Sequence, residues 1–282
     1  MKLPLSCLGL VALLLSCSAK GDTIIGTPIT RVPSVISKPG DYRLAKNLTL
    51  AKGSDAAIVI SASNVNLDFN GYTLTASGTT NSAGGIGVWI RASRVTVRNG
   101  TIVGFGDAVA AINATTPLSS ITIEDLTCQT QLGAASLYID SSDTTLLRCH
   151  VTNPSGAATT NNGIYLNASA TVEDCTVSDL IATGSTVLGF VIHDGPGTGQ
   201  ATDVLRHCVV SNLSTTGSSS HQGGVWYGSA NTVVDDCYFY NLDIPVAQGT
   251  GQIIVKNSTF RACGSSLGAG NATDGGNNTF VP

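Results

Sequence analysis

Three polar residues that could take part in proton transfer end three similar apolar segments of this sequence. Asp140 ends SLYID, Asn167 ends GIYLN and His193 ends GFVIH. If these segments are strands stacked side by side, the three side chains lie on successive strands and could surround one substrate group. Tyr138 and Tyr165 stand two positions earlier in two of the segments, so strand alternation places them on the same face.

Two kinds of chemistry fit these residue types, and the sequence leaves both open. Proton abstraction beside a uronate carboxylate, the step of lyases and epimerases, would use His193 or Tyr165 as the base while Asn167 holds the carboxylate. Hydrolysis of a glycosidic bond would use Asp140 and Asp194, which are about 10 Å apart at the backbone, nearer the inverting than the retaining separation. The simpler alternative is that the histidine and aspartate at 193 and 194 have a structural role in a turn.

The same face is expected to bind a carbohydrate. Alignment of the apolar segments places aromatic and polar residues in one exposed column, with apolar rings for sugar faces and polar groups for hydroxyls. The residues predicted to bind substrate are Trp89, Arg91, Asn113, Tyr138, Asn167 and Trp226. Alternation also places Ala111 and Val191 outward. The alternative is that aromatic residues simply favour strands, or that the loops after each segment cover them.

These segments belong to a unit that recurs along the chain. Each is followed by a polar turn and then by a strand, a one-residue corner and another strand, as in VTVRNGTI (95–102), TVEDCTV (171–177) and VVDDCYF (233–239). The unit recurs about every 27 residues, a period typical of solenoids, in which each unit buries its apolar side against neighbouring units. The sequence therefore predicts an all-β solenoid.

The repeated phrases resemble those of the right-handed parallel β-helix repeat family, which is related in architecture to pectate lyases. The resemblance covers roughly residues 37–282, and ISKPGDYRL, NLDFNGYTL and VRNGTIVGF are particularly similar to the family's first coils. It implies a single right-handed parallel β-helix over residues 36–282, with an N-terminal cap and about eight or nine coils of three strands each.

The resemblance also implies a residue in left-handed conformation at the corner between the second and third strands of each coil. These corner residues are Asn70, Asn99, Asp125, Arg148, Asp174, His207, Asp236 and Asn257. Asn, Asp and His tolerate a positive φ better than other residues with a side chain, so Arg148 is the one departure.

Two columns beside the corner have structural interpretations. The residue after the corner is a cysteine in four copies and Gly, Leu or Ser in others, which predicts buried free thiols and argues against a metal site. These cysteines are Cys149, Cys175, Cys208 and Cys237. The residue before the corner alternates in charge along the stack, which predicts a ladder of ion pairs rather than a catalytic cluster. The charged members are Arg98, Glu124, Glu173, Arg206, Asp235 and Lys256.

The composition limits the class of partner. The chain has 282 residues, a net charge of −4 and a sequence pI near 5.4, so it has no electrostatic basis for binding nucleic acid. No cofactor and no set of metal ligands is indicated. A calcium requirement stays open, although no residue supports it.

The N-terminal segment predicts export. One lysine is followed by an apolar run from Leu8 to Leu15 and then by small residues, the pattern of a secretory signal. The stretch LLSC at 14–17 resembles a bacterial lipobox, which would make residues 1–17 a lipoprotein signal and Cys17 the lipidated residue. Residues 18–35 are expected to form a tether. The protein would then be secreted by a bacterium or anchored to its outer membrane.

Two hypotheses for function follow. In the first, an exported cell-envelope protein binds a polysaccharide or surface glycan along its first sheet and acts on it as a lyase, epimerase or hydrolase. In the second, the chain is a non-catalytic structural or adhesion module of the cell surface. The scarcity of titratable groups on the predicted face favours the second hypothesis.

Overall fold

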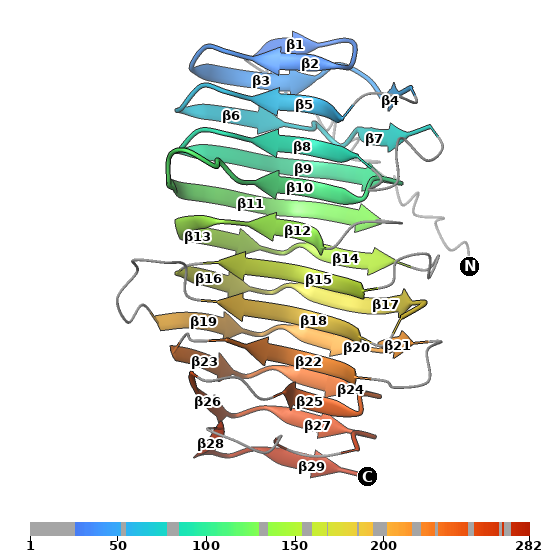
Figure 1. The fold of residues 1–282 in the computed structure, drawn as a ribbon, viewed down its shortest axis with the longest axis vertical. Coiled ribbons are helices and arrows are strands. Elements are labelled where there is room, and N and C mark those ends of the chain that lie inside the picture. The colour runs from blue at the N-terminus through green and yellow to red at the C-terminus, as the bar shows by residue number, and fades with distance from the viewer. Residues whose placement is uncertain are drawn as a thin grey trace, which may run out of the picture.

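The chain winds into a stack of parallel coils (Figure 1). The computed structural model describes residues 26–51, 55–77, 85–129, 135–153, 160–167, 169–184, 186–193, 202–215, 221–228, 231–247, 251–264, 267 and 272–282. None of these residues is helical, and the strand pairs run parallel. One sheet has nine strands and the other has twenty. The predicted right-handed parallel β-helix of eight or nine coils is confirmed.

The coils contribute their strands in a fixed order. The first strands form the nine-stranded sheet: β2 (Ser34–Ile36), β5 (Ala56–Ile60), β8 (Ile86–Ile90), β10 (Asp107–Ala111), β12 (Ala135–Ile139), β15 (Thr160–Asn167), β18 (Thr186–His193), β22 (His221–Tyr227) and β25 (Ile244–Ala247). The second strands are β1 (Thr27–Ile29), β3 (Gly40–Leu44), β6 (Val65–Asp68), β13 (Ser141–Leu147), β16 (Ala170–Glu173), β19 (Thr202–Arg206), β23 (Asn231–Asp235), β26 (Gln252–Lys256) and β28 (Ala272–Gly276).

The remaining strands follow the corner. They are β4 (Leu48–Leu50), β7 (Thr73–Ala76), β14 (His150–Asn153), β17 (Thr176–Ala182), β20 (Val209–Ser211), β21 (Ser214–Thr215), β24 (Tyr238–Tyr240), β27 (Thr259–Arg261) and β29 (Thr279–Val281). Strands β9 (Val95–Val103) and β11 (Leu118–Gln129) run through the corner and serve as both second and third strands. Second and third strands together make up the twenty-stranded sheet.

The corner between the second and third strands is built as the sequence predicts. All eight predicted corner residues have a positive φ, between 50° and 60°, and Asn277 adds a ninth. In this conformation the corner amide reaches the next coil: the N–H of Asp174 donates to the carbonyl of Arg206, and the N–H of His207 donates to that of Asp235. The corner therefore contributes a hydrogen bond between coils as well as a change of direction.

Arg148, the corner residue of an unsuited type, has strong partners. Its guanidinium donates to both carboxylate oxygens of Asp125 on the preceding coil, at 2.7 and 2.8 Å, and lies 3.6 Å from Glu124. The hydrogen bonds from Arg148 hold the pKa of Asp125 below its ordinary value. A bidentate pair of this kind offsets part of the cost of the positive φ.

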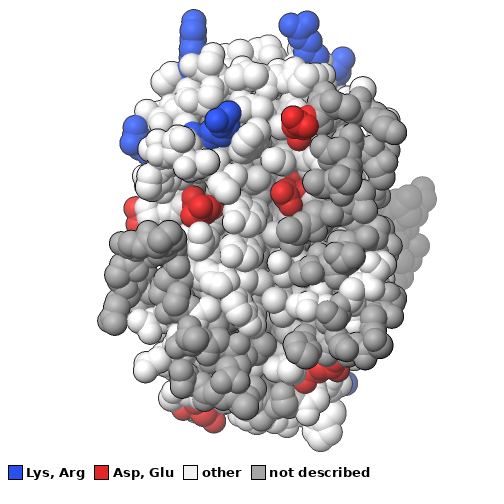
Figure 2. Space-filling view, in the orientation of Figure 1, with Lys and Arg blue, Asp and Glu red and all other residues white. Residues whose placement is uncertain are grey.

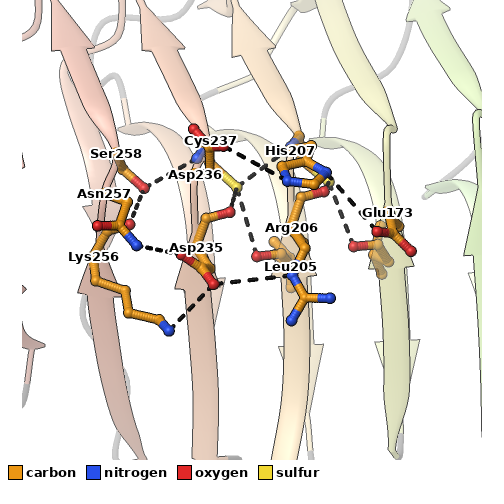
Figure 3. A network of polar contacts seen from close by, with 12 residues as sticks. Glu173, Leu205, Arg206, His207, Asp235, Asp236, Cys237, Lys256, Asn257 and Ser258 are labelled. Carbon is orange, nitrogen blue, oxygen red and sulfur yellow. Dashed lines mark hydrogen bonds and ion pairs between the residues drawn. The ribbon is translucent and has the colours of Figure 1, made fainter.

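The charges just before the corner form the predicted ladder of ion pairs. Arg98 Nη1 lies 3.8 Å from a carboxylate oxygen of Glu124 on the next coil. Further along the stack, Asp235 lies between Arg206 at 3.9 Å and Lys256 at 3.2 Å (Figure 3). Each exposed pair contributes about 1 kcal/mol or less, so the main effect of the alternation is to avoid like charges on neighbouring strands.

The predicted column of buried thiols is also confirmed. Cys149, Cys175, Cys208 and Cys237 are at most 3% exposed, and all are free. The amide of Cys149 donates to Sγ of Cys175 at 3.4 Å, and the amide of Cys208 donates to Sγ of Cys237 at the same distance. Where the column continues as Ser258, its Oγ accepts from the amide of Cys237 at 3.1 Å. A thiol or hydroxyl here satisfies a buried amide of the preceding coil.

The β-helix begins earlier than the predicted boundary at residue 36. Strand β1 pairs with β3, with Ile29 opposite Leu44, and both residues are buried. Strand β2 begins at Ser34. The predicted tether at 18–35 is therefore wrong for its last ten residues, because they contribute β1 and the start of β2 to the stack and Ile29 packs in the core. The predicted signal segment, including Cys17, lies outside the described residues.

The last coil covers the core with polar and apolar groups together. Asp274 in β28 pairs with the buried Val255, and its carboxylate accepts a hydrogen bond from Asn278 Nδ2 at 2.7 Å. Phe280 in β29 continues the internal ring stack on Phe260, with the centroids 5.0 Å apart, and is 46% exposed. A charge at an inward position of an outermost strand opposes the addition of a further strand.

The contact between coils can be tested at Gly100. A Cβ there would lie 2.2 Å from Cβ of the buried Phe69, so we expect Gly100→Ala to lower the free energy of unfolding by about 3 kcal/mol. Gly71 is the matched control, because it has a φ of 75° but open space around it. Gly71→Ala should cost only about 1 kcal/mol of backbone strain. Denaturant unfolding measures both, and equal losses would contradict this packing.

Candidate functional site

The outer face of the nine-stranded sheet carries most of the predicted site residues. Strand pairing places one residue of each coil opposite the next in a single column. The column consists of Trp89, Ala110, Tyr138, Tyr165, Val191, Trp226 and Ala247. Figure 2 views the molecule from this side and shows few charged side chains over the described middle of the face. The face is thus mainly aromatic, aliphatic and neutral polar.

Four rings from successive coils stack on this face, and we call them the ring ladder: Tyr138, Tyr165, His193 and Trp226. The two tyrosine rings are nearly parallel, with centroids 4.8 Å apart and 6° between their planes. The His193 ring lies 5.5 Å from the Tyr165 ring and 4.7 Å from the Trp226 ring, tilted by 31° and 56°. The residue paired with Tyr165 and Trp226 is Val191, so the His193 ring extends the ladder from two positions further along β18.

Gly228 makes room for the His193 ring. A Cβ at Gly228 would lie 2.3 Å from Nδ1 and 2.7 Å from Cε1 of His193. The backbone at this position is fixed, because the Gly228 amide donates to the carbonyl of Ile192 at 2.7 Å. Any side chain at position 228 would therefore displace the imidazole from the ladder.

Asp140 and Asn167 form a polar pair beside the ring ladder. Asn167 Nδ2 donates to Oδ1 of Asp140 at 3.1 Å, and both residues are half-buried. Asn167 in β15 is paired with His193 in the neighbouring strand β18. The structure thus brings Asp140, Asn167 and His193 onto successive coils. Asp194 lies outside the described residues.

Both phenols of the ring ladder are harder to ionise than an ordinary tyrosine. Burial raises the pKa of Tyr138, and nearby Tyr165, Asp140 and Asp107 raise it further. Burial and then the charge of Asp140 raise the pKa of Tyr165. At neutral pH both hydroxyls keep their protons and can donate and accept hydrogen bonds. A raised pKa is unfavourable for the predicted role of Tyr165 as a base.

Asp107 is a feature of this face that was not predicted from the sequence. It begins β10, and burial raises its pKa to about 6 against the effect of a hydrogen bond from the Ala135 amide. Its Oδ1 has no hydrogen-bond partner in the part of the chain that the structure describes. Because its charge affects the pKa of Tyr138, the two groups lie near each other. An aspartate opening the apolar strand DAVAA was the signal that could have identified it.

Three predicted binding residues form a second group at the N-terminal side of the ring ladder. The Arg91 guanidinium carbon lies 4.8 Å from the centroid of the Trp89 ring, within the range of a cation–π contact. Trp89 Nε1 donates to the carbonyl of Ile112 at 3.4 Å, and Asn113 Nδ2 donates to the carbonyl of Arg91 at 2.9 Å. The coil of β10, to which Asn113 belongs, lies between Trp89 and the ring ladder, and Arg91 is four coils from His193.

The register predicted for β10 is wrong by one residue. Ala111 was expected to face outward, but it pairs with Ile90 and is fully buried, whereas Ala110 takes the position opposite Trp89. The run AVAAI is apolar on both faces, so alternation alone does not determine which alanine points out. As a result Asn113 lies beyond the strand and turns back toward Arg91 instead of continuing its column.

Two further properties of the described residues bear on the class of protein. They contain no group of three or more His, Cys, Asp or Glu side chains arranged to hold a metal ion. Among the residues that the structure describes, there is also no helix with the length and apolar character needed to cross a bilayer.

The parallel coils and their stacked outward side chains define a parallel β-helix with one ring-bearing face. Residues 35–189, more than half of the chain, match the family model described as right handed beta helix region, and the chain belongs to this family. No curated protein matches the sequence. Among solved structures, the Streptococcus pneumoniae surface protein and adhesin PfbA is similar over 89% of this chain and 90% of that chain, with 9% identity and a TM-score of 0.31.

The environment of Asp107 predicts a pH-dependent stability. Its folded-state pKa of about 6 is above the ordinary value of 3.8, so its favourable contribution is complete below 3.8 and is lost as the pH rises through 6. We expect Asp107→Asn, which removes the charge, to raise the free energy of unfolding by about 1–2 kcal/mol at pH 8 and to have little effect at pH 4. Urea unfolding at the two pH values measures this, and an equal effect at both would contradict it.

The contact between Gly228 and His193 predicts a spectroscopic change. In Gly228→Ala, the new methyl group displaces the imidazole from between the Tyr165 and Trp226 rings. The ring-proton resonances of His193, assigned with His193→Ala, should lose their ring-current shifts and move toward the positions of an exposed histidine. Gly71→Ala, which meets no atom within 4 Å, should leave these resonances in place. Unchanged resonances in Gly228→Ala would refute the assigned position of the ring.

Proposed function

We propose that this protein binds a polysaccharide along the outer face of its nine-stranded sheet, as an exported binding or adhesion module. The ring ladder, with the Asp140–Asn167 pair beside it, is the observation that carries the proposal. Rings held rigidly next to neutral hydrogen-bonding groups suit a carbohydrate, whose surface alternates apolar C–H faces with hydroxyls. Export rests on the N-terminal segment, with Cys17 as the residue to be lipidated.

The geometry of the ladder determines how a sugar would contact it. Tyr138 and Tyr165 cover each other's faces, so they offer ring edges and hydroxyls to a ligand. Trp226 is the last ring of the ladder, and among the described residues no further ring stacks on its side directed toward β25. The Trp226 face directed toward β25 is therefore the position for stacking of one sugar ring. The hydroxyls of Tyr138 and Tyr165 then donate hydrogen bonds to the following sugars or accept them.

A binding role explains this arrangement better than proton abstraction does. A tyrosine base needs a lowered pKa, and that of Tyr165 is raised. Hydrolysis through Asp140 is the second candidate, since Asp140 and His193 lie on either side of Asn167 on successive coils. Its partner carboxylate would be Asp194. The same experiment distinguishes the two candidates, because only hydrolysis releases reducing ends.

The test is a binding panel with the purified protein and oligosaccharides of pectate, alginate, hyaluronan, neutral glucans and amino-sugar polymers. Trp226→Ala should weaken binding of the preferred glycan by about tenfold, which is about 1.4 kcal/mol, because the terminal ring face is lost. Tyr240→Ala is the matched control, since Tyr240 is 37% exposed but lies in β24 of the other sheet. Its affinity should equal that of the unchanged protein.

The outcomes separate the candidate functions. Binding that depends on Trp226, without new reducing ends or unsaturated uronate, supports a non-catalytic module. Release of reducing ends without unsaturated uronate, abolished in Asp140→Asn, supports hydrolysis. Binding that is reduced equally by Tyr240→Ala and Trp226→Ala, or no binding to any glycan, overturns the proposed face.

A further inference from the structure

We propose that the preferred ligand of this face is a polysaccharide bearing free amino groups, and that the face excludes polyuronates. This inference rests on the proposed function and names the class of substrate for the same site. It departs from the uronate chemistry that the sequence left open. Three observations carry it: the distribution of basic residues, the position of Asp140, and the two tyrosine hydroxyls of the ring ladder.

Basic residues are absent from the part of the chain that forms the ring ladder. After Arg98 the whole sequence contains only four: Arg148, Arg206, Lys256 and Arg261. The first three belong to the ladder of ion pairs at the corner, and Arg261 lies in β27 of the twenty-stranded sheet. The strands of the nine-stranded sheet from β10 to β25 therefore contain no lysine or arginine that a ligand on this face could contact.

This absence matters because a carboxylated sugar needs a cation to replace its hydration. Arginine and lysine are the side chains that bind carboxylates strongly, arginine through two parallel hydrogen bonds. Arg91 stacks on Trp89, a residue of the column, and is four coils from His193. At about 4.8 Å per coil it lies roughly 10 Å from Tyr138, the nearest ring of the ladder, and roughly 19 Å from His193. A uronate bound at Tyr165, His193 or Trp226 would have no lysine or arginine beside it.

The charge that the face does offer is negative. One carboxylate oxygen of Asp140 accepts a hydrogen bond from Asn167, and within the described residues the carboxylate forms no ion pair. Asp140 ends the segment of Tyr138, two residues after it, and its charge raises the pKa of both Tyr138 and Tyr165. A uronate carboxylate at this position would therefore be repelled.

Together these groups match an ammonium. A carboxylate supplies a charge-assisted hydrogen bond to an ammonium, and protonated phenol hydroxyls beside it accept further hydrogen bonds from its N–H groups. The Asp140 carboxylate and the hydroxyls of Tyr138 and Tyr165 provide this combination on two adjacent coils. A deacetylated hexosamine in a sugar chain running along the stack would place its amino group at Asp140, while its neighbours contact the rest of the ring ladder.

The experiment compares ligands that differ only in this group. Isothermal titration of the full chain uses glucosamine oligomers, N-acetylglucosamine oligomers of the same length, and oligogalacturonate, in low-salt buffer at mildly acidic pH. We expect the amino oligomer to bind about five- to tenfold more tightly than the acetylated one, as for one partly exposed ion pair, and the uronate not to bind. Rising salt should reduce the preference.

Two variants assign the preference to Asp140. Asp140→Asn keeps the size of the side chain but removes the charge, so the preference should disappear: within this variant the amino and acetylated oligomers should bind with equal affinity. Asp179→Asn is the matched control: Asp179 also accepts a hydrogen bond from an asparagine side chain, that of Asn212, at 3.2 Å, but in β17 of the other sheet. It changes the net charge equally and should leave the preference intact.

Different results would overturn different statements. Equal binding of the amino and acetylated oligomers, tighter binding of oligogalacturonate, or loss of the preference in Asp179→Asn overturns the assignment of an amino-sugar ligand. In those cases binding that still depends on Trp226 leaves the polysaccharide-binding face standing. Absence of binding to every oligosaccharide overturns the proposed function itself.

Discussion

Parallel backbone hydrogen bonding between successive coils is the constraint on which the other features of this protein depend. It holds equivalent residues about one strand spacing apart, so the register determines which side chains lie next to each other. Charges at the corner must then alternate in sign, as around Asp235, and corner residues must share a left-handed conformation. Thiols such as Cys175 recur because one small acceptor per coil satisfies one amide. In this fold, the position of a residue in its repeat therefore determines which distant residues it contacts.

The ring ladder follows from the same constraint, with one local exception. Tyr138 and Tyr165 stack because register places them opposite each other. The third ring belongs to His193, which is not the paired residue, and it reaches its position because Val191 is small and Gly228 has no side chain. The face is therefore an outcome of both register and available space, and the surrounding polar groups determine which ligands it accepts.

The sequence predicted those features that repeat. Corner residues, buried cysteines and alternating charges recur from coil to coil, in eight, four and six copies, so several copies support each inference, and even the unsuited Arg148 took the expected conformation. Features that occur once were harder to predict. The run around Ala110 is apolar on both faces, so its pattern does not determine the register. The position of the His193 ring depends on Gly228, which is 35 residues later in the chain. Burial of Asp107 depends on packing that no local pattern records.

Each coil touches only the coils before and after it, and this has a consequence for how such a face can change over evolutionary time. Duplication or deletion of one coil lengthens or shortens the row of ligand contacts by one strand spacing and leaves the geometry of every other contact unaltered. The coil that contains Ala110, for example, adds one strand spacing between Trp89 and Tyr138. Ligand length and side-chain chemistry are therefore separately adjustable: the first by the number of coils, the second by substitution within a coil.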